Sequence, residues 1–365
     1  MARRRCEGEE ARRLEERLDQ YTAPAALVRP LEDGNVQCLA CAHHCVIRPG
    51  ARGICRMRAN RPEVPGVGRL IAPRGYVAGL AADPIEKKPL FHVLPGREAL
   101  SFGMLGCNLV CDFCQNWISS QALKDADSSV HMQRLSAEHV VQIALERGSP
   151  VIASTYNEPL ITAEWAHEIL SLAKPHGIRG AFISNGYAGP EVLEYLRPVL
   201  DVYKVDLKTF QDAHYRQLGG RLQPVLDTIA RAREMGFWVE VVTLVIPGFN
   251  DSDGELRDMA QFLAGISKDI PWHVTAFHPD YEEKTGARPT TVADITRAAQ
   301  AGSDAGLRFV YAGNLRGRAG DMENTRCPGC KATLIQRSGY AVPSIRIGAN
   351  GKCPGCGYIL PGIWA

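Results

Sequence analysis

The chain has 365 residues, of which 45% are hydrophobic and 22% charged, as in an ordinary globular protein. The 42 Lys and Arg residues nearly balance the 40 Asp and Glu residues, and the net charge of +2 argues against nucleic acid as a partner. No apolar run approaches the roughly 18 residues that a membrane-spanning helix needs, so we expect no membrane partner.

Residues 1–30 are expected to form a charged helix or tail. Basic residues stand at its start, but the apolar stretch of a secretory signal does not follow them, and we therefore expect a cytoplasmic protein. In that compartment the 12 cysteines of the chain favour metal binding over disulfides. All but Cys6 lie in three groups along the chain.

The first cysteine group lies in the segment 31–95. Its members are Cys38, Cys41, Cys45 and Cys55, with the spacing C-x2-C-x3-C-x9-C. Four thiolates this close can hold zinc or a second iron–sulfur cluster, and the spacing does not decide between the two. The neighbouring His43 and His44 could add ligands, but four cysteines already complete such a site.

The segment 96–315 alternates short apolar runs with helical patterns. The runs are 99–105, 150–155, 180–184, 201–207, 237–246, 272–277 and 307–312. They are rich in β-branched and aromatic residues and nearly continuous, as in parallel strands that are buried on both faces. One helical pattern starts at Ser136, a candidate N-cap, and ends at Gly148. The alternation predicts an α/β fold with a partial (β/α) barrel, or alternatively a doubly wound sheet.

Polar residues follow the predicted strands. In a parallel barrel the chemistry is located at the carboxyl ends of the strands, which we call the mouth. The polar stretches are 107–114, 155–159, 184–187, 206–208, 246–251 and 278–281. We also expect four further residues near the mouth, where they could meet a substrate, although a histidine there is more often simply held by hydrogen bonds. They are His273, His278, Asp280 and Tyr281.

The second cysteine group follows the first predicted barrel strand. Cys107, Cys111 and Cys114 have the spacing C-x3-C-x2-C. A cluster of four irons needs one outside ligand for each iron, so three cysteines leave one iron open. An open position is how a metal site binds a substrate. The alternative is a structural site whose fourth ligand is remote in sequence.

The third cysteine group lies in the segment 316–365. Its members are Cys327, Cys330, Cys353 and Cys356, in two C-P-G-C motifs with 22 residues between them. This pattern predicts a zinc-ribbon-like module, in which the metal supplies folding free energy to a segment with few large apolar side chains.

The central cysteine motif, with the aromatic Phe113 directly before Cys114, resembles the signature of radical S-adenosylmethionine enzymes. The resemblance implies the partial barrel over about residues 100–315, a [4Fe-4S] cluster on the three cysteines, and S-adenosylmethionine on the open iron. It also implies reductive cleavage of S-adenosylmethionine to a 5′-deoxyadenosyl radical, which abstracts hydrogen from a substrate.

The resemblance also implies contacts to S-adenosylmethionine. Asn157 and Glu158 stand at a Gly-Gly-Glu-type motif of the family, and only Glu158 matches it. Three further segments are similar to the pyruvate formate-lyase activase branch: Ser184-Asn185-Gly186, Asp206-Leu207-Lys208 and the strand-five segment at Ile246. Ile183 replaces an acidic residue of that branch, which argues against a cation site. Taken singly, these motifs are also ordinary caps, turns and ion pairs.

Nearly all of residues 35–365 resembles the AmmeMemoRadiSam system radical S-adenosylmethionine enzymes. The matching segments include CLACAHHC, GCNLVCDFCQNW, STYNEP and CPGCGYILPGIW. The resemblance implies AMMECR1-type and Memo-type partner proteins and a flavodoxin or ferredoxin as electron donor. The substrate is expected to be a partner protein, through post-translational modification or glycyl-radical-type activation, with a small molecule as an alternative. A different class also remains open, a multi-zinc binding scaffold on a barrel that has lost its chemistry.

Overall fold

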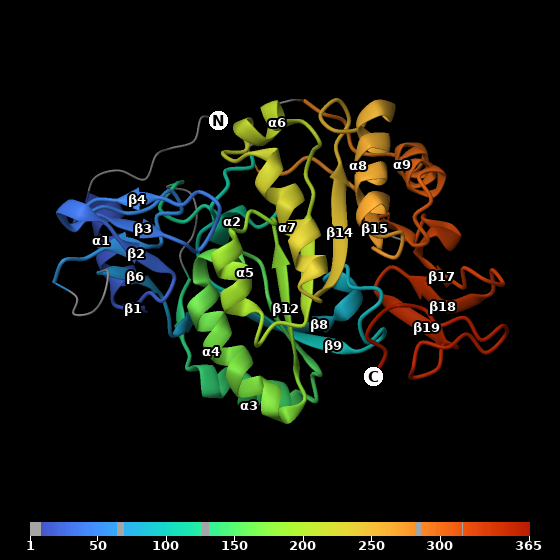
Figure 1. The fold of residues 1–365 in the computed structure, drawn as a ribbon, viewed down its shortest axis with the longest axis horizontal. Coiled ribbons are helices and arrows are strands. Elements are labelled where there is room, and N and C mark those ends of the chain that lie inside the picture. Colours follow the sequence, from blue (N-terminus) through green and yellow to red (C-terminus); the bar gives the residue numbers. More distant parts are fainter. Residues whose placement is uncertain (1–8, 64–68, 126–130, 282–285, 316) are drawn as a thin grey trace.

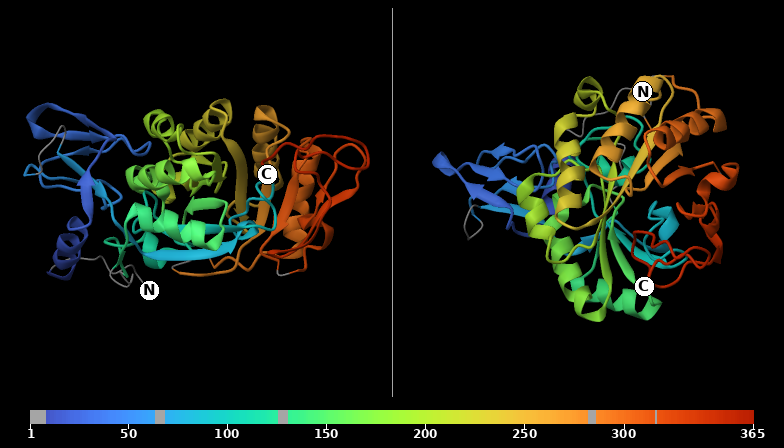
Figure 2. Two further views of the ribbon diagram at one scale, coloured as in Figure 1. Left: turned by 90° about the horizontal axis from the view of Figure 1, so that it is seen from below. Right: turned by 45° about the vertical axis from the view of Figure 1, so that its right-hand side comes forward.

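The computed structural model describes residues 9–63, 69–125, 131–281, 286–315 and 317–365. Cys6 and the first part of the expected N-terminal helix lie outside these ranges. A central body with a large sheet lies between an N-terminal module (blue) and a C-terminal module (red), which stand on opposite sides of it (Figures 1 and 2).

The central sheet has eight strands in the order β16-β15-β14-β13-β12-β11-β9-β8. All neighbours from β9 to β16 are parallel, and β8 pairs antiparallel with β9 at the edge. The parallel strands confirm the seven apolar runs predicted from the sequence. The strands are β8 (Gly79–Pro84), β9 (Glu98–Gly103), β11 (Val151–Ser154), β12 (Arg179–Ser184), β13 (Val202–Asp206), β14 (Trp238–Val245), β15 (Trp272–Ala276) and β16 (Val310–Gly313).

Helices follow the parallel strands and lie outside the sheet (Figure 1). Spatial order follows chain order, so right-handed crossovers place the helices on one face and leave the other face free to line a site. Ser136 caps α3 as predicted, and Gly148 ends it with a φ of 62°. The helices are α2 (Trp117–Ser120), α3 (Ala137–Arg147), α4 (Ala163–Ala173), α5 (Pro190–Leu196), α6 (Asp212–Gln217), α7 (Leu222–Glu234), α8 (Asp253–Ile266) and α9 (Val292–Asp304).

The inner face of the sheet is closed at one end by residues 85–97, which we call the plug segment. Its buried Ile85, Leu90 and Val93 pack on small and β-branched strand residues such as Ala153 and Val202. The main core is larger, and it includes outer-face strand residues and residues of the helices that cover them. Because apolar side chains fill the amino end of the inner face, only the carboxyl end remains open for a site.

Glu240 on β14 holds the plug segment. Its buried carboxylate accepts hydrogen bonds from the backbone N–H groups of Phe91 (3.0 Å) and His92 (2.9 Å), and from Trp238 Nε1 (3.0 Å). His273 Nε2 lies 2.7 Å from the same carboxylate. The expectation that His273 lies near the mouth is therefore wrong. It is the second residue of β15, at the plugged end of the sheet, and only 2% exposed.

The N-terminal module contains α1 (Glu9–Asp19) and two three-stranded antiparallel sheets, ordered β1-β6-β5 and β2-β3-β4. The C-terminal module is a three-stranded antiparallel sheet, β17-β18-β19. The strands of the N-terminal module are β1 (Thr22–Pro24), β2 (Val28–Pro30), β3 (Val36–Cys38), β4 (Val46–Ile47), β5 (Ala59–Asn60) and β6 (Leu70–Pro73). The remaining strands are β7 (Tyr76–Val77), β10 (Gln133–Arg134), β17 (Thr325–Arg326), β18 (Thr333–Ser338) and β19 (Ala341–Ile345).

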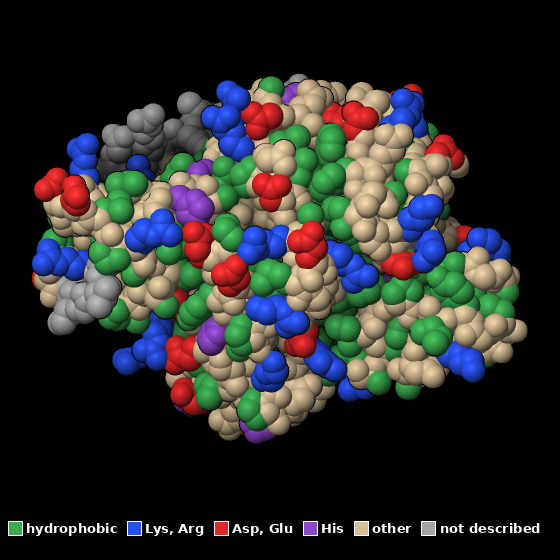
Figure 3. Space-filling view, viewed as in Figure 1, with side chains coloured by type: hydrophobic (Ala, Val, Ile, Leu, Met, Phe, Trp, Pro, Cys, Tyr) green, Lys and Arg blue, Asp and Glu red, His purple; other side chains and the backbone are tan. Residues whose placement is uncertain are grey.

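In the face shown in Figure 3, acidic and basic side chains are interspersed rather than gathered into one basic patch. Within the described ranges of the chain, no helix is both long enough and apolar enough to cross a membrane.

Candidate active site and metal centres

A cavity of about 380 Å³ opens at the carboxyl ends of the parallel strands. Its walls come from both halves of the sheet, from the plug segment and from the C-terminal module. The residues that carry polar or charged groups into it include Cys107, Cys111, Cys114, Thr155, Asn157, Glu158, Asn185, Lys204, Asp206, Lys208, Thr275, Asn314, Lys87, Lys88 and Tyr340. The structure thus gathers residues that are up to about 250 positions apart in the chain around one space.

The three thiols of the central group lie side by side in the cavity wall. Cys107 Sγ accepts hydrogen bonds from Leu109 N (3.4 Å) and Asn185 Nδ2 (3.7 Å), and Cys114 Sγ lies 3.2 Å from Ser120 Oγ. Burial raises the pKa of Cys107 to about 12 and that of Cys111 to about 11, so binding of a metal must drive their deprotonation.

These thiols fit a [4Fe-4S] cluster with one open iron. Three cysteines are available, and among the described residues that line the cavity there is no fourth cysteine. The polar donors on Cys107 are of the kind that orient and stabilise a thiolate ligand. The open position would face the cavity, where a small molecule can enter.

Glu158 ties two of the mouth loops together. Its Oε1 accepts hydrogen bonds from Ser184 Oγ (2.7 Å) and Leu160 N (3.1 Å), and its Oε2 accepts one from Asn185 N (2.8 Å). It also caps the 3-10 turn η3 (Pro159–Thr162). Burial raises its pKa to about 7. Glu158 therefore positions Asn185 next to the cysteine loop. Ser184 donates its hydroxyl hydrogen to Glu158 and does not line the cavity.

A ladder of charges follows alternate residues of β13 and the loop after it. Asp206 accepts a hydrogen bond from Lys204 Nζ, and Lys208 Nζ lies 3.9 Å from its other oxygen. Burial alone would raise the pKa of Asp206, but the two lysines hold it below its usual value. Lys204 was not among the residues predicted from the sequence. A lysine within the apolar run VYKVDL, two positions before Asp206, was the available signal.

The other predicted residues occupy different places. Phe113 and Asn157 line the cavity, and Asn157 Oδ1 accepts a hydrogen bond from Met104 N (3.0 Å). Ile246 is buried in the same apolar cluster as Cys111 and Phe113 and does not line the cavity. 

Residues 278–281 lie beside the cysteine loop. His278 Nε2 is 3.3 Å from Gln115 Nε2, and the ring of Tyr281 stacks on Trp117 with centroids 4.8 Å apart. The exposed Asp280 accepts a hydrogen bond from the backbone N–H of Tyr281.

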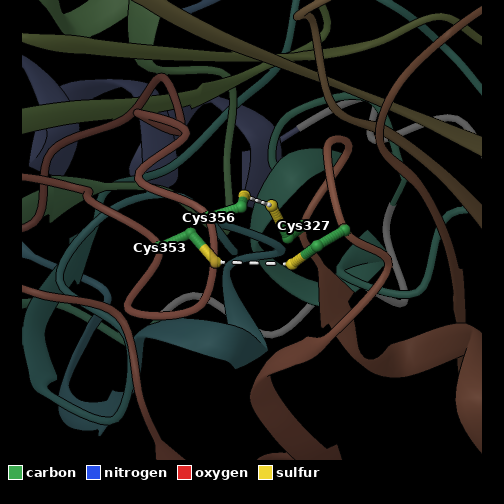
Figure 4. A group of neighbouring side chains, drawn as sticks. Cys327, Cys353 and Cys356 are labelled. Carbon is green, nitrogen blue, oxygen red and sulfur yellow. Dashed lines mark hydrogen bonds between the residues drawn. The ribbon is translucent and has the colours of Figure 1, made fainter.

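The C-terminal cysteines form a compact group that could hold a metal ion. All four sulfurs lie within 4.8 Å of one another, with 3.5 Å between Cys327 and Cys356 and 3.7 Å between Cys330 and Cys353. Figure 4 shows the labelled Cys327, Cys353 and Cys356 pointing into one space. A zinc ion with Zn–S bonds of about 2.3 Å holds its sulfurs about 3.8 Å apart, so these residues fit one tetrahedral ion.

Comparisons with known proteins agree with the three-thiol cavity. A profile of the Radical SAM superfamily matches residues 103–263. The uncharacterized protein MJ0808 of Methanocaldococcus jannaschii is 36% identical over 335 residues, which are 91% of this chain and 97% of that protein.

Two relatives with a named activity match part of the chain. The GTP 3′,8-cyclase of Aquifex aeolicus is 30% identical over 168 residues, which are 44% of this chain and 50% of the cyclase. The pyruvate formate-lyase-activating enzyme of Clostridium pasteurianum is 26% identical over 179 residues, which are 47% of this chain and 71% of that enzyme. The chain belongs to the radical SAM superfamily, and this membership indicates that it is an enzyme.

Proposed function

We propose that this protein cleaves S-adenosylmethionine reductively at a cluster on Cys107, Cys111 and Cys114 and acts on a partner protein. The observation that carries the proposal is the set of three thiols in the wall of one open cavity. When bound there, the [4Fe-4S] cluster and S-adenosylmethionine together supply a 5′-deoxyadenosyl radical, which takes a hydrogen atom from the substrate. The surrounding protein holds the cofactors and limits access of water.

The residues around the thiols suit a zwitterionic, cationic ligand such as S-adenosylmethionine. Lys204 and Lys208 can balance a carboxylate, and Asp206 and Glu158 can balance an ammonium or sulfonium group. Asn157 and Asn185 offer neutral hydrogen bonds beside the cysteine loop. We place Phe113 with the cluster and Ser184 and Ile246 behind this layer, where they support it.

A protein substrate is favoured by the relationship to activating enzymes. The relative from Clostridium pasteurianum is by name an enzyme that activates pyruvate formate-lyase, and two further relatives are the choline trimethylamine-lyase and benzylsuccinate synthase activating enzymes. We infer that AMMECR1-type and Memo-type proteins are candidate partners and that a flavodoxin or ferredoxin is the electron donor. The C-terminal cysteines are proposed to bind zinc in a module spanning 316–365.

A small-molecule substrate is the second candidate. It is favoured by the relationship to the GTP 3′,8-cyclase of Aquifex aeolicus, whose name gives a nucleotide as substrate. The cavity, at about 380 Å³, lies in the size range of small-molecule sites.

Formation of 5′-deoxyadenosine tests the proposed function. The protein is reconstituted anaerobically with iron and sulfide, reduced with dithionite and given S-adenosylmethionine, and Cys111→Ala and Cys6→Ala are treated in the same way. Cys6→Ala removes a thiol outside the three groups and is the matched control. We expect product from the wild type and Cys6→Ala and none from Cys111→Ala. Equal product from Cys111→Ala would contradict the proposal, and zinc at all three sites without cleavage would favour the scaffold.

A further inference from the structure

The three cysteine groups differ in how closely their sulfurs lie. Within the part of the chain that the structure describes, the C-terminal set is the group of cysteines whose sulfurs all lie within 4.8 Å of one another. In the N-terminal set, no three of the described sulfurs lie this close to one another. The three sulfurs of the central set do not either. A single tetrahedral ion needs sulfurs about 3.8 Å apart, whereas a four-iron cluster carries each cysteine on a different iron and spreads them. The N-terminal set thus resembles the central set rather than the C-terminal one.

The N-terminal set is nevertheless one buried group. Cys38, Cys41 and Cys55 are buried, and Cys45 is half-buried. Cys38 N donates a hydrogen bond to Cys45 O (2.9 Å), and a Cβ on Gly53, two residues before Cys55, would lie 3.7 Å from Cys45 Sγ, so these members lie near one another.

The N-terminal set lies directly against the loop that carries the central set. His43 Nε2 is 3.0 Å from the backbone oxygen of Asn108, the residue after Cys107. A second contact joins Ala42 N to Tyr187 O at 3.0 Å. Gly106, which precedes Cys107, leaves no room for a side chain, because a Cβ there would lie 2.3 Å from Met57 Cγ. The path from Cys41 to Cys107 therefore crosses a short stretch of backbone and one hydrogen bond.

The outer side of the N-terminal set is suited to a protein partner. Val46 and Ile54, which adjoin Cys45 and Cys55 in sequence, are 61% and 47% exposed. Arg48 and Arg56 are also exposed in the same stretch. Exposed apolar residues with positive charges nearby favour an electron carrier with an acidic surface.

We propose that Cys38, Cys41, Cys45 and Cys55 hold a second iron–sulfur cluster, which is the entry point for electrons to the active site. An acidic flavodoxin or ferredoxin binds beside Val46 and Ile54 and reduces this cluster by one electron. The cluster is reoxidised when it passes the same electron along the His43–Asn108 contact to the cluster at Cys107, Cys111 and Cys114. No bond is made or broken in this transfer. The relay rests on the proposed function, but the presence of the second cluster does not.

The presence of the second cluster is tested in a variant without the central one. Cys107→Ala, Cys111→Ala and Cys114→Ala are combined in the full chain, which is reconstituted with iron and sulfide and studied by metal analysis and Mössbauer spectroscopy. We expect about four irons per chain, against about eight in the wild type. Iron-free protein with about two zinc ions per chain would overturn the proposal, because zinc would then fill both four-cysteine sets. This result does not depend on S-adenosylmethionine cleavage.

The relay is tested at the surface, where substitutions leave the cysteines in place. Arg48→Glu with Arg56→Glu is compared with Arg147→Glu plus Arg346→Glu, an equal charge change at exposed positions elsewhere. For each protein the rate of 5′-deoxyadenosine formation with reduced bacterial flavodoxin is divided by its own rate with dithionite. We expect this ratio to fall about tenfold or more for the first pair only, as electrostatic guidance is lost. Equal ratios in both pairs would overturn the relay, whereas absence of product with dithionite in the wild type would instead contradict the proposed function.

Discussion

Arg58 of the N-terminal module forms a buried ion pair with Glu164 of α4 in the central body. Its Nη1 lies 3.0 Å from Glu164 Oε1, and its Nε donates to Ile161 O at 2.9 Å. Arg58 is only 1% exposed. We predict that Arg58→Met lowers the free energy of unfolding by about 3–5 kcal/mol, because it leaves the Glu164 carboxylate without its partner charge. Urea unfolding measures the change.

The double variant Arg58→Met with Glu164→Leu separates the ion pair from lost packing. Removing both charges avoids an unpaired buried group, so the double variant is expected to recover a large part of the loss. A double variant that is less stable than the single one would contradict this account of the contact between the N-terminal module and the central body.

His92 in the plug segment predicts a dependence of stability on pH. Its Nδ1 donates to Pro361 O (2.7 Å), so its Nε2 accepts from Tyr311 OH (2.7 Å) and the ring is neutral. Burial lowers its pKa to about 4. An unfolded histidine has a pKa near 6.5, so between about pH 6.5 and 4 only the unfolded chain binds this proton. The stabilisation is full above about pH 6.5 and is lost as the pH falls toward 4.

Comparison with His92→Gln isolates this contribution from those of other histidines. The wild type is expected to be the more stable protein at pH 7, because glutamine fits the two hydrogen bonds less well. From pH 7 to pH 5 we expect the difference in unfolding free energy to shrink by about 2 kcal/mol. This follows because pH 5 lies about 1.5 units below the pKa of the unfolded histidine, and each unit corresponds to about 1.4 kcal/mol. A difference that stays constant over this range in urea unfolding would rule out the neutral buried ring.

Glu158→Gln is expected to loosen the mouth loops. Its three donors, two backbone N–H groups and the Ser184 hydroxyl, all point at carboxylate oxygens. A glutamine amide must turn an NH₂ group toward one of these donors, which leaves that donor unsatisfied and costs about 1–3 kcal/mol. Thermal unfolding measures the loss, and an unchanged melting temperature would contradict the central role of the carboxylate.

The parallel strands, and the polar residues that lie together at one end of them, could be predicted from the sequence. Both follow from local signals, the apolar runs and the polar residues after them. The plug segment could not be predicted, because Ile85, Leu90 and Val93 show no regular periodicity and their partners lie on distant strands. His273 was misplaced for a related reason. Its position along β15 depends on where the strand begins, and its partner Glu240 lies 33 residues away.

Contacts between the modules could not be predicted from the sequence. Tyr340 lines the cavity from the turn between β18 and β19, although the cysteine loop is more than 200 residues away in the chain. The N-terminal cysteines lie within 18 residues of sequence and the C-terminal cysteines within 30, yet it is the C-terminal sulfurs that all lie within 4.8 Å of one another. Spacing limits which ligands can meet, but the surrounding packing sets the distances between them.

Loss of the C-terminal metal is expected to reach the active-site cavity. Cys327 and Cys353 are buried in the core of the C-terminal module, while Cys330 and Cys356 are exposed. The module is anchored to the plug segment by Arg337, whose Nη2 donates to Phe91 O at 2.8 Å. We therefore predict that Cys330→Ser with Cys356→Ser removes about one zinc ion per chain and loosens the turn at Tyr340.

Hydrogen–deuterium exchange locates this effect, and metal analysis confirms the loss of zinc. Exchange should rise at least about tenfold in β18 and β19, because metal binding and folding of such modules are coupled. Exchange in α4 should not change, since that helix lies in the central body and packs against α3 and β12. The exposed Ile359→Ala in the same module is the matched control and should keep both zinc and protection. Unchanged exchange around Tyr340 in the zinc-free double variant would show that packing on the plug segment alone holds this wall of the cavity.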